Sequence, residues 1–316
     1  MKQEEPILVA IHCLVYNHEP YLRDCFEGFV KQKTNFRFVA IVHEDCSTDN
    51  SAAIVREYET KYPDIFRPIY EIENQWSKHD GSLERIMNEA IDTTGAKYIA
   101  MCEGDDYWTD PYKLQKQVDY MEEHEEFSMC YTDYQTVDEN GRIFDWPNHA
   151  KHVKVSFAGD NFRNLIKSNY IITASTLFRT DIILNPSLSL SWDYSLFLNA
   201  ALVGKLCYIP QKTACYRLQP NSVVHTAYEL VNSGLNEVWY QFASYYVTTP
   251  SVHRSFWEHM MILGTIDANL ISKMLIQGSD AERAKGFLHA HKSLKLAYPI
   301  GFMMRVRNKI AKRFRK

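Results

Sequence analysis

Residues 98–111 have the sequence YIAMCEGDDYWTDP, and this stretch decides the fold class. Its apolar start, 98–102, has the length and the boundaries of a buried strand. The strand leads into the acidic segment 103–106, EGDD, where glycine allows a sharp turn and residues two apart share one face of an extended chain. Such crowded carboxylates repel one another unless a cation or hydrogen-bond donors compensate. Because Mg²⁺ and Mn²⁺ prefer oxygen ligands and also hold phosphate oxygens, the stretch predicts a divalent-metal site for a phosphorylated ligand. An acidic solvated turn has the same composition.

The segments before this stretch alternate between strand-like and helix-like patterns. The expected strands are 7–15, 36–43 and 66–72, and the expected helices are 21–32, 51–61 and 83–93. With 98–102 as a fourth strand, this order is typical of an α/β fold with a mostly parallel sheet flanked by helices.

Acidic residues also follow the second expected strand, at Glu44 and Asp45, and Ser47 or Thr48 is placed to cap the next helix. In open α/β sheets, ligands bind beyond the carboxyl ends of the strands. We therefore expect the two acidic strand ends to meet in one crevice. The sequence has neither a GxxxxGK[ST] nor a GxGxxG motif, which favours phosphate binding through a metal over binding by a glycine-rich loop.

Composition narrows the protein class. The chain of 316 residues can hold one or two domains, and its net charge of -4 gives no reason to expect nucleic acid as a partner. Its seven cysteines lack CxxC or zinc-like spacing, and the N-terminus is acidic before its apolar run. These features predict a cytoplasmic protein with reduced thiols. No apolar stretch reaches the roughly 18 residues that span a bilayer.

Three segments together resemble the family 2 inverting glycosyltransferases. They are 9–32, VAIHCLVYNHEPYLRDCFEGFVKQ; 41–58, IVHEDCSTDNSAAIVREY; and 95–121, GAKYIAMCEGDDYWTDPYKLQKQVDYM. They follow the order and spacing of the family's opening strand, its VDDGSTD segment and its DxDD motif. The resemblance implies a GT-A fold, a nucleotide-sugar donor, most simply a UDP-sugar, and a Mn²⁺ or Mg²⁺ cofactor.

The resemblance assigns donor contacts to the first half of the chain. It places Tyr16 near the base, and Glu44 and Asp45 at the base or ribose. The family's Ala-Arg-Asn segment is not clear, but Arg85 is a possible substitute whose register is shifted. A solvated helix face is the alternative for Arg85.

The resemblance also assigns metal and phosphate contacts. Glu103 stands where the family usually has an aspartate, near the ribose or diphosphate, and Asp105 is the metal ligand, helped by Asp106. Segment 216–219, YRLQ, resembles the family's Tyr-Arg-x-His ending, which makes Arg217 a phosphate partner. Because glutamine replaces the histidine at 219, His225 is a substitute metal ligand.

The second half supplies the expected acceptor side. We expect a strand at 127–138, a loop at 146–154, a helix at 159–168 and a strand at 169–179 with hydroxyls that face a sugar. Segment 191–198, SWDYSLFL, followed by the turn and strand 204–210, resembles the family segment that carries the general base. Asp193 is then the catalytic residue that deprotonates the acceptor, unless it only caps a helix.

These patterns give a domain plan. We expect a GT-A domain at 1–224, with a nucleotide-binding half at 1–110 and an acceptor half at 111–224, and a helical extension at 225–316. The tail, 305–316, has seven Lys or Arg residues and no acid, with apolar residues at near-helical spacing. Such a segment can lie on an anionic membrane surface, although a solvated terminus has the same composition.

The expected function is metal-dependent, inverting transfer of a hexosyl or N-acetylhexosaminyl group to a hydroxyl of a glycan or lipid-linked glycan. By resemblance, its setting is bacterial surface-polysaccharide synthesis. Two alternatives stay open. A catalytically silent nucleotide- or sugar-binding module is consistent with the departures at Glu103 and Gln219. A metal-dependent nucleotidyltransferase also uses clustered carboxylates, but usually needs a glycine-rich loop.

Overall fold

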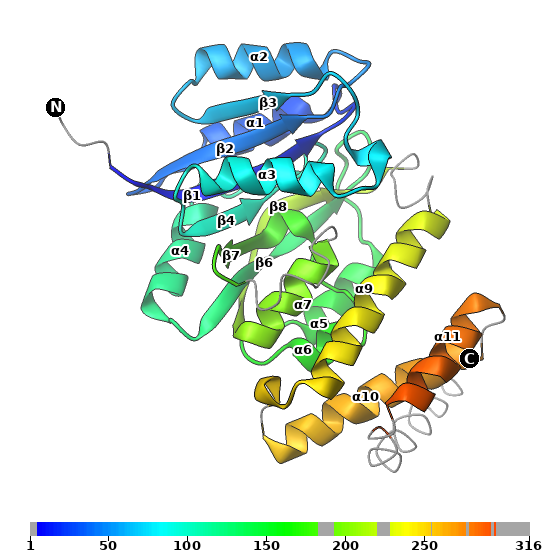
Figure 1. Ribbon diagram of the computed structural model, residues 1–316. Helices are drawn as coiled ribbons and strands as arrows, with labels where there is room; N and C mark the ends of the chain where they lie inside the picture. Colours follow the sequence, from blue (N-terminus) through cyan, green and yellow to red (C-terminus); the bar gives the residue numbers. More distant parts are fainter. Residues whose placement is uncertain are drawn as a thin grey trace. The chain divides into compact units, whose positions relative to one another are not determined.

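A computed structural model describes residues 5–182, 193–219, 228–253, 255–275, 278–291 and 294 (Figure 1). Contacts divide the chain into two compact units. The first contains Met1–Asp160, Tyr170–Asn185 and Asn199–Val231, and the second contains Asn161–Asn169, Pro186–Leu198 and Asn232–Lys316. The domain boundaries expected at 110 and 224 stay predictions.

One sheet organises the first unit. Its strands are β1 (Ile7–Val15), β2 (Arg37–Glu44), β3 (Phe66–Tyr70), β4 (Tyr98–Met101), β5 (Tyr107–Trp108), β6 (Phe127–Val137), β7 (Thr176–Arg179) and β8 (Lys205–Arg217). Their order in the sheet is β3-β2-β1-β4-β7-β6-β8-β5. The pairs β1–β2, β2–β3, β1–β4 and β6–β8 are parallel, and the pairs that involve β5 and β7 are antiparallel. The predicted mostly parallel α/β sheet is confirmed.

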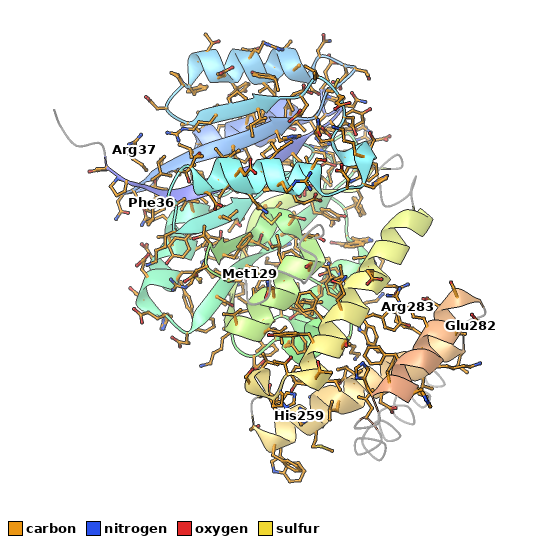
Figure 2. All side chains as sticks on the ribbon, in the orientation of Figure 1. Phe36, Arg37, Met129, His259, Glu282 and Arg283 are labelled. Carbon is orange, nitrogen blue, oxygen red and sulfur yellow. The ribbon has the colours of Figure 1, made fainter. Side chains whose placement is uncertain are left out.

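Helices cover both faces of the first four strands (Figure 1). Helices α1 (Leu22–Val30), α2 (Ser51–Lys61) and α4 (Lys113–Glu123) pack on one face, and α3 (Ser82–Asp92) packs on the other. Successive strand residues point to opposite faces. Ile11 of β1 therefore joins the core under α1, whereas Ala10 joins Met87 and Ile91 of α3. Met129 of β6 is fully buried in the same sheet (Figure 2).

Each strand and helix expected before residue 102 begins and ends within two residues of its prediction. The predicted cap of α2 was wrong. Asn50 is the N-cap residue, and the Asp49 carboxylate accepts a hydrogen bond from the Ser51 backbone N–H at 2.9 Å. The side chain of Ser47 instead accepts from the Asn17 backbone N–H at 3.0 Å, which ties this loop to the end of β1.

The loop predicted at 146–154 was also wrong, because helix α5 spans Pro147–Val155. Proline at its start suits a first helical turn. None of its side chains is buried. The helix therefore lacks the apolar stripe by which a sequence pattern predicts an amphipathic helix. Two imidazoles hold it to β6: His149 Nε2 lies 2.7 Å from Asp133 Oδ1, and His152 Nδ1 lies 2.7 Å from the Tyr134 hydroxyl.

Segment 159–179 is less regular than expected. It contains α6 (Phe162–Leu165), the 3-10 turn η2 (Thr173–Ser175) and the short β7. The hydroxyls expected to face a sugar make local bonds, since Ser175 donates to the Ile172 carbonyl at 2.7 Å and Thr176 to the Thr173 carbonyl at 2.8 Å.

The second unit is helical. It contains α6, the start of α7 (Asp193–Val203), most of α9 (Tyr228–Thr248), the turn η3 (Pro250–Val252), α10 (Phe256–Met274) and α11 (Ser279–Ala290). Phe162 stacks on Tyr246 at 5.1 Å, and His259 of α10 stacks on His253 at 3.8 Å (Figure 2). The expected C-terminal helical region is confirmed. In the described part of the chain, no helix is long and apolar enough to cross a membrane. The basic tail, 305–316, lies outside the described residues.

Candidate active site

The candidate site lies where β1, β2 and β4 end together at one edge of the sheet (Figure 1). Backbone bonds join these ends. The Asp45 N–H, just after β2, donates to the Val15 carbonyl at 2.9 Å, and the Gly104 N–H, just after β4, donates to the Leu14 carbonyl at 2.9 Å. The predicted convergence of the two acidic strand ends therefore exists.

Position 104 requires glycine because side chains of the chain around the end of β1 pack closely against it, and not because the backbone is left-handed there. Its φ lies outside the left-handed region, contrary to our expectation that its conformational freedom makes the turn. A Cβ atom at this position would lie 2.7 Å from Nδ1 of His18 and 3.0 Å from Cδ1 of Leu22. The acidic segment thus packs directly against the chain that follows β1.

The end of β8 fixes the two aspartates of the acidic segment. The Arg217 backbone N–H donates to Asp106 Oδ1 at 2.8 Å, and Gln219 Nε2 donates to Asp105 Oδ2 at 2.8 Å. Asp106 is only 4% exposed. Burial, followed by the neighbouring Asp105 carboxylate, raises the pKa of Asp106 well above its usual value. Gln219, at the family's histidine position, therefore orients the predicted metal ligand.

The Arg217 side chain contacts several segments at this edge of the sheet. Its guanidinium lies over the Tyr21 ring at 4.5 Å, Nε donates to the Asp105 carbonyl at 2.9 Å, and Nη2 lies 3.3 Å from Asp24 Oδ2. The side chain is 2% exposed. Its contacts position the acidic segment, and its predicted role as a phosphate partner stays a prediction.

The residues expected to hold the nucleoside surround the end of β2. Tyr16 is 45% exposed. Glu44 Oε1 accepts from the Ser47 N–H at 2.8 Å. Asp45 is 4% exposed, and its two oxygens accept from the backbone N–H groups of Gln75 and Trp76 at 2.6 and 3.1 Å. Sequence reasoning missed both partners, because nothing local marks a loop residue as the donor to an aspartate 30 positions earlier.

Three further residues were predicted to belong to the site. Arg85 is exposed on α3 and donates to the Asp80 carbonyl at 3.1 Å. Asp193 is the first residue of α7 and belongs to the second unit, where its Oδ1 accepts from the Tyr194 N–H at 2.6 Å. His225 lies outside the described residues. The roles assigned to these residues stay predictions.

The side chains at this edge decide whether a divalent metal could bind here. Within the described ranges, no group of three or more His, Cys, Asp and Glu side chains is arranged to hold a metal ion. Mg²⁺ is commonly held by one or two carboxylates together with substrate phosphates. Asp105 and Asp106 supply two adjacent carboxylates, and each has one oxygen bonded to the end of β8. The pair therefore fits a metal shared with a bound diphosphate.

Comparison with known proteins identifies the family. The sequence profile of glycosyl transferase family 2 matches residues 11–184, which is more than half of the chain. The chain belongs to glycosyl transferase family 2. This family 2 chain is 31% identical over 221 residues to the uncharacterized protein Rv1520 of Mycobacterium tuberculosis, over 70% of its own length and 61% of the relative's. It is 27% identical to the putative teichuronic acid biosynthesis glycosyltransferase TuaG of Bacillus subtilis, with 68% and 81% covered. It thus spans about three-fifths of the length of the Mycobacterium relatives that it matches.

Solved structures share the fold. S. aureus TarS 1–349 in complex with UDP-GlcNAc matches with a TM-score of 0.57 and 14% identity, over 93% of this family 2 chain and 92% of TarS. The mannosyltransferase PcManGT from Pyrobaculum calidifontis, in complex with GDP-Man and Mn²⁺, matches with a TM-score of 0.51 and 11% identity, with 96% and 87% covered. At these identities the similarity establishes the fold, and it confirms the expected GT-A architecture.

Proposed function

We propose that this protein is a metal-dependent inverting glycosyltransferase that moves a sugar from a nucleotide-sugar donor to a hydroxyl of a glycan or lipid-linked glycan. One observation carries the proposal: the acidic segment after β4 meets the end of β8 beside the ends of β1 and β2. Gln219 reaches Asp105, and Arg217 reaches Asp106, across more than 100 residues of sequence. This arrangement supports a donor site in which the groups proposed for the phosphates and those proposed for the base share one edge of the sheet.

The donor is proposed to be a UDP-sugar that carries a hexose or an N-acetylhexosamine. TarS, which shares the fold, was solved with UDP and with UDP-GlcNAc, whereas PcManGT was solved with GDP-Man. Tyr16, Glu44 and Asp45 form the nucleoside side of the proposed site, and Glu103, Asp105 and Arg217 form its diphosphate side. Arg85 is a further candidate at the donor, from α3.

The proposed cofactor is Mn²⁺ or Mg²⁺, held by Asp105 and Asp106 together with the donor. His225 remains a candidate ligand. A bound divalent cation stabilises the negative charge of a departing diphosphate. Gln219 and Arg217 keep the two carboxylates in place, and the burial of Asp106 excludes water from one side of the pair.

The proposed base is Asp193. It takes the proton of the acceptor hydroxyl while that oxygen bonds to the anomeric carbon, opposite to the nucleotide, and the bond between that carbon and the diphosphate oxygen breaks. Attack from the opposite face inverts the anomeric configuration. The acceptor is proposed to belong to a bacterial surface polysaccharide; the relative TuaG is named as a putative teichuronic acid biosynthesis glycosyltransferase.

The protein is proposed to act in the cytoplasm, at the inner face of the membrane. The basic tail, 305–316, would hold it by attraction to anionic lipid headgroups. This placement brings the site to a lipid-linked acceptor.

A donor screen tests the proposal. Release of nucleoside diphosphate is measured over a panel of UDP-, GDP- and TDP-sugars with acceptor glycans, with Mn²⁺ or Mg²⁺ and then with a chelator. We expect one donor class to react and the chelator to stop the reaction. Asp193→Asn should bind UDP as the wild type does and lose transfer by about 10²–10⁴-fold, the range for a general base.

The Gln219–Asp105 bond favours one alternative, a silent nucleotide-binding module, because glutamine replaces the family's histidine beside the predicted metal ligand. That alternative predicts nucleotide binding with no turnover of any donor, with or without metal. Release of pyrophosphate from nucleoside triphosphates would instead indicate a nucleotidyltransferase.

A further inference from the structure

The segment between β3 and α3 is tied to the base-side end of β2. Its 3-10 turn, η1 (Trp76–Lys78), begins where the Asp45 carboxylate accepts the N–H groups of Gln75 and Trp76. Asn74 adds a bond from its side-chain amide to the Asp45 carbonyl at 3.0 Å. Three consecutive residues of this segment are therefore bonded to one buried aspartate.

Further contacts hold the start of the same segment. Gln75 Nε2 donates to Glu71 Oε2 at 2.9 Å, and Glu71 Oε1 lies 3.3 Å from Nε2 of the fully buried His43 on β2. The Glu71 N–H donates to the Glu44 carbonyl at 3.0 Å. The turn is thus held before any ligand arrives.

The Trp76 ring remains accessible although its backbone is bonded to Asp45. It is 37% exposed, and it makes an edge-to-face contact with the His79 ring at 4.9 Å and 75°. Tyr16, also partly exposed, directly follows Val15, whose carbonyl accepts the Asp45 N–H. The backbone that carries each of these two accessible rings is therefore bonded at Asp45: the Trp76 N–H donates to its carboxylate, and the carbonyl of Val15, next to Tyr16, accepts its N–H.

We propose that Trp76 binds the base of the donor nucleotide by stacking, on the side opposite to Tyr16, and that Asp45 is a positioning residue that holds Trp76. The inference rests on the proposed function. Every base has an apolar π-face, and stacking on an aromatic side chain contributes about 1–3 kcal/mol per base. Each Asp45 oxygen already accepts a backbone N–H, so its first effect on the nucleotide is exerted through the turn.

UDP titrations of the full chain test the inference, with Kd from calorimetry and KM and kcat from donor turnover. Trp76→Ala should raise Kd and KM about 5–150-fold, as the stacking range implies, and leave kcat within about twofold. Trp76→Phe retains a ring and should restore most of the affinity. Trp76→Leu retains apolar bulk without a π-face and should bind as weakly as alanine; it also serves if the alanine variant does not fold.

The matched control is Trp257→Ala, which removes a tryptophan that is 75% exposed on α10 in the second unit. It should bind UDP as the wild type does. A double-mutant cycle tests the role of Asp45. If Asp45 acts through Trp76, Asp45→Asn weakens UDP binding alone but adds little to Trp76→Ala.

The outcomes separate the inference from the proposed function. If the wild type and Trp76→Ala bind UDP equally, Trp76 is not the base platform, while the glycosyltransferase proposal stands. Additive losses in the cycle overturn the positioning role of Asp45. A wild type that binds none of UDP, GDP and TDP overturns both the inference and the proposed donor class.

Discussion

At the scale of the residue, Gly104 controls how closely the acidic segment packs on the chain after β1. The missing side chain lets Val15, His18 and Leu22 approach the segment that carries Asp105. Most of these contacts come from well-buried residues, which cannot move without disturbing the core beneath the strand ends.

Gly104→Ala should therefore lower the free energy of unfolding by about 1–3 kcal/mol, the usual cost of overpacking, and weaken UDP binding. Urea denaturation and UDP titration measure the two effects. The control is Gly286→Ala in α11, where an added Cβ meets nothing within 4 Å and helix propensity favours alanine. A Gly104→Ala protein as stable as the wild type would show that the packing at this position is loose.

Arg217 shows a second effect at this scale. A basic residue near a diphosphate site suggests a phosphate contact, yet its guanidinium is enclosed by Tyr21, Tyr107 and Asp24. The buried guanidinium contacts the acidic segment through the Asp105 carbonyl. Its loss should therefore disturb the position of Asp105 as well as any contact with the donor.

At the scale of the element, β1 carries a half-buried histidine on the face that α3 covers. Burial, opposed in part by a backbone hydrogen bond and helped by nearby His43, lowers the pKa of His12 from 6.5 to about 4. His12 is therefore neutral at pH 7. Between pH 6.5 and 4 the unfolded chain binds a proton at this position that the folded protein does not, so stability falls as the pH falls.

We expect this histidine alone to lower the free energy of unfolding by about 3 kcal/mol between pH 7 and pH 4, from the size of the pKa shift. Urea denaturation at several pH values, with His12→Gln as the comparison, isolates the effect from the titrating carboxylates. The variant should lose less stability than the wild type over this interval. Parallel pH profiles would mean that folding does not change the pKa of His12.

Helix α5 shows that a helix can form without an apolar pattern in its sequence. Its side chains lack a buried stripe, and it is held by the Asp133–His149 and Tyr134–His152 contacts. Periodicity predicts helices that bury an apolar face, so it predicted a loop here. By contrast, the amphipathic α1, α2 and α3 lie where their patterns placed them.

At the scale of the whole molecule, the tail is expected to decide where the protein works. Removal of residues 305–316 takes away seven basic residues. Each basic residue near an anionic membrane surface contributes about 1 kcal/mol to the free energy of membrane binding. The truncated protein should therefore lose sedimentation with vesicles that contain anionic lipid and keep its turnover with a soluble acceptor.

Vesicles of neutral lipid serve as the control, and binding should weaken as salt rises because the attraction is electrostatic. Replacement of the seven basic residues by glutamine distinguishes charge from apolar insertion. If the truncated chain still sediments with anionic vesicles, the tail is a solvated terminus.

The sequence by itself determined the elements of the first sheet, the acidic ends of β2 and β4, and the family. These features are local: hydrophobic period, turn residues and motif spacing are properties of neighbouring residues. They were sufficient to place Asp45 and the 103–106 segment at strand ends.

Only the tertiary structure decided which groups those carboxylates meet. Asp45 meets the backbone of Gln75 and Trp76, and Asp106 meets Arg217, 111 residues away in the chain. Backbone N–H groups occur at almost every residue, so no sequence pattern marks the one that an aspartate will use. The strand order of the sheet brings these segments together, and strand order is a property of the folded chain.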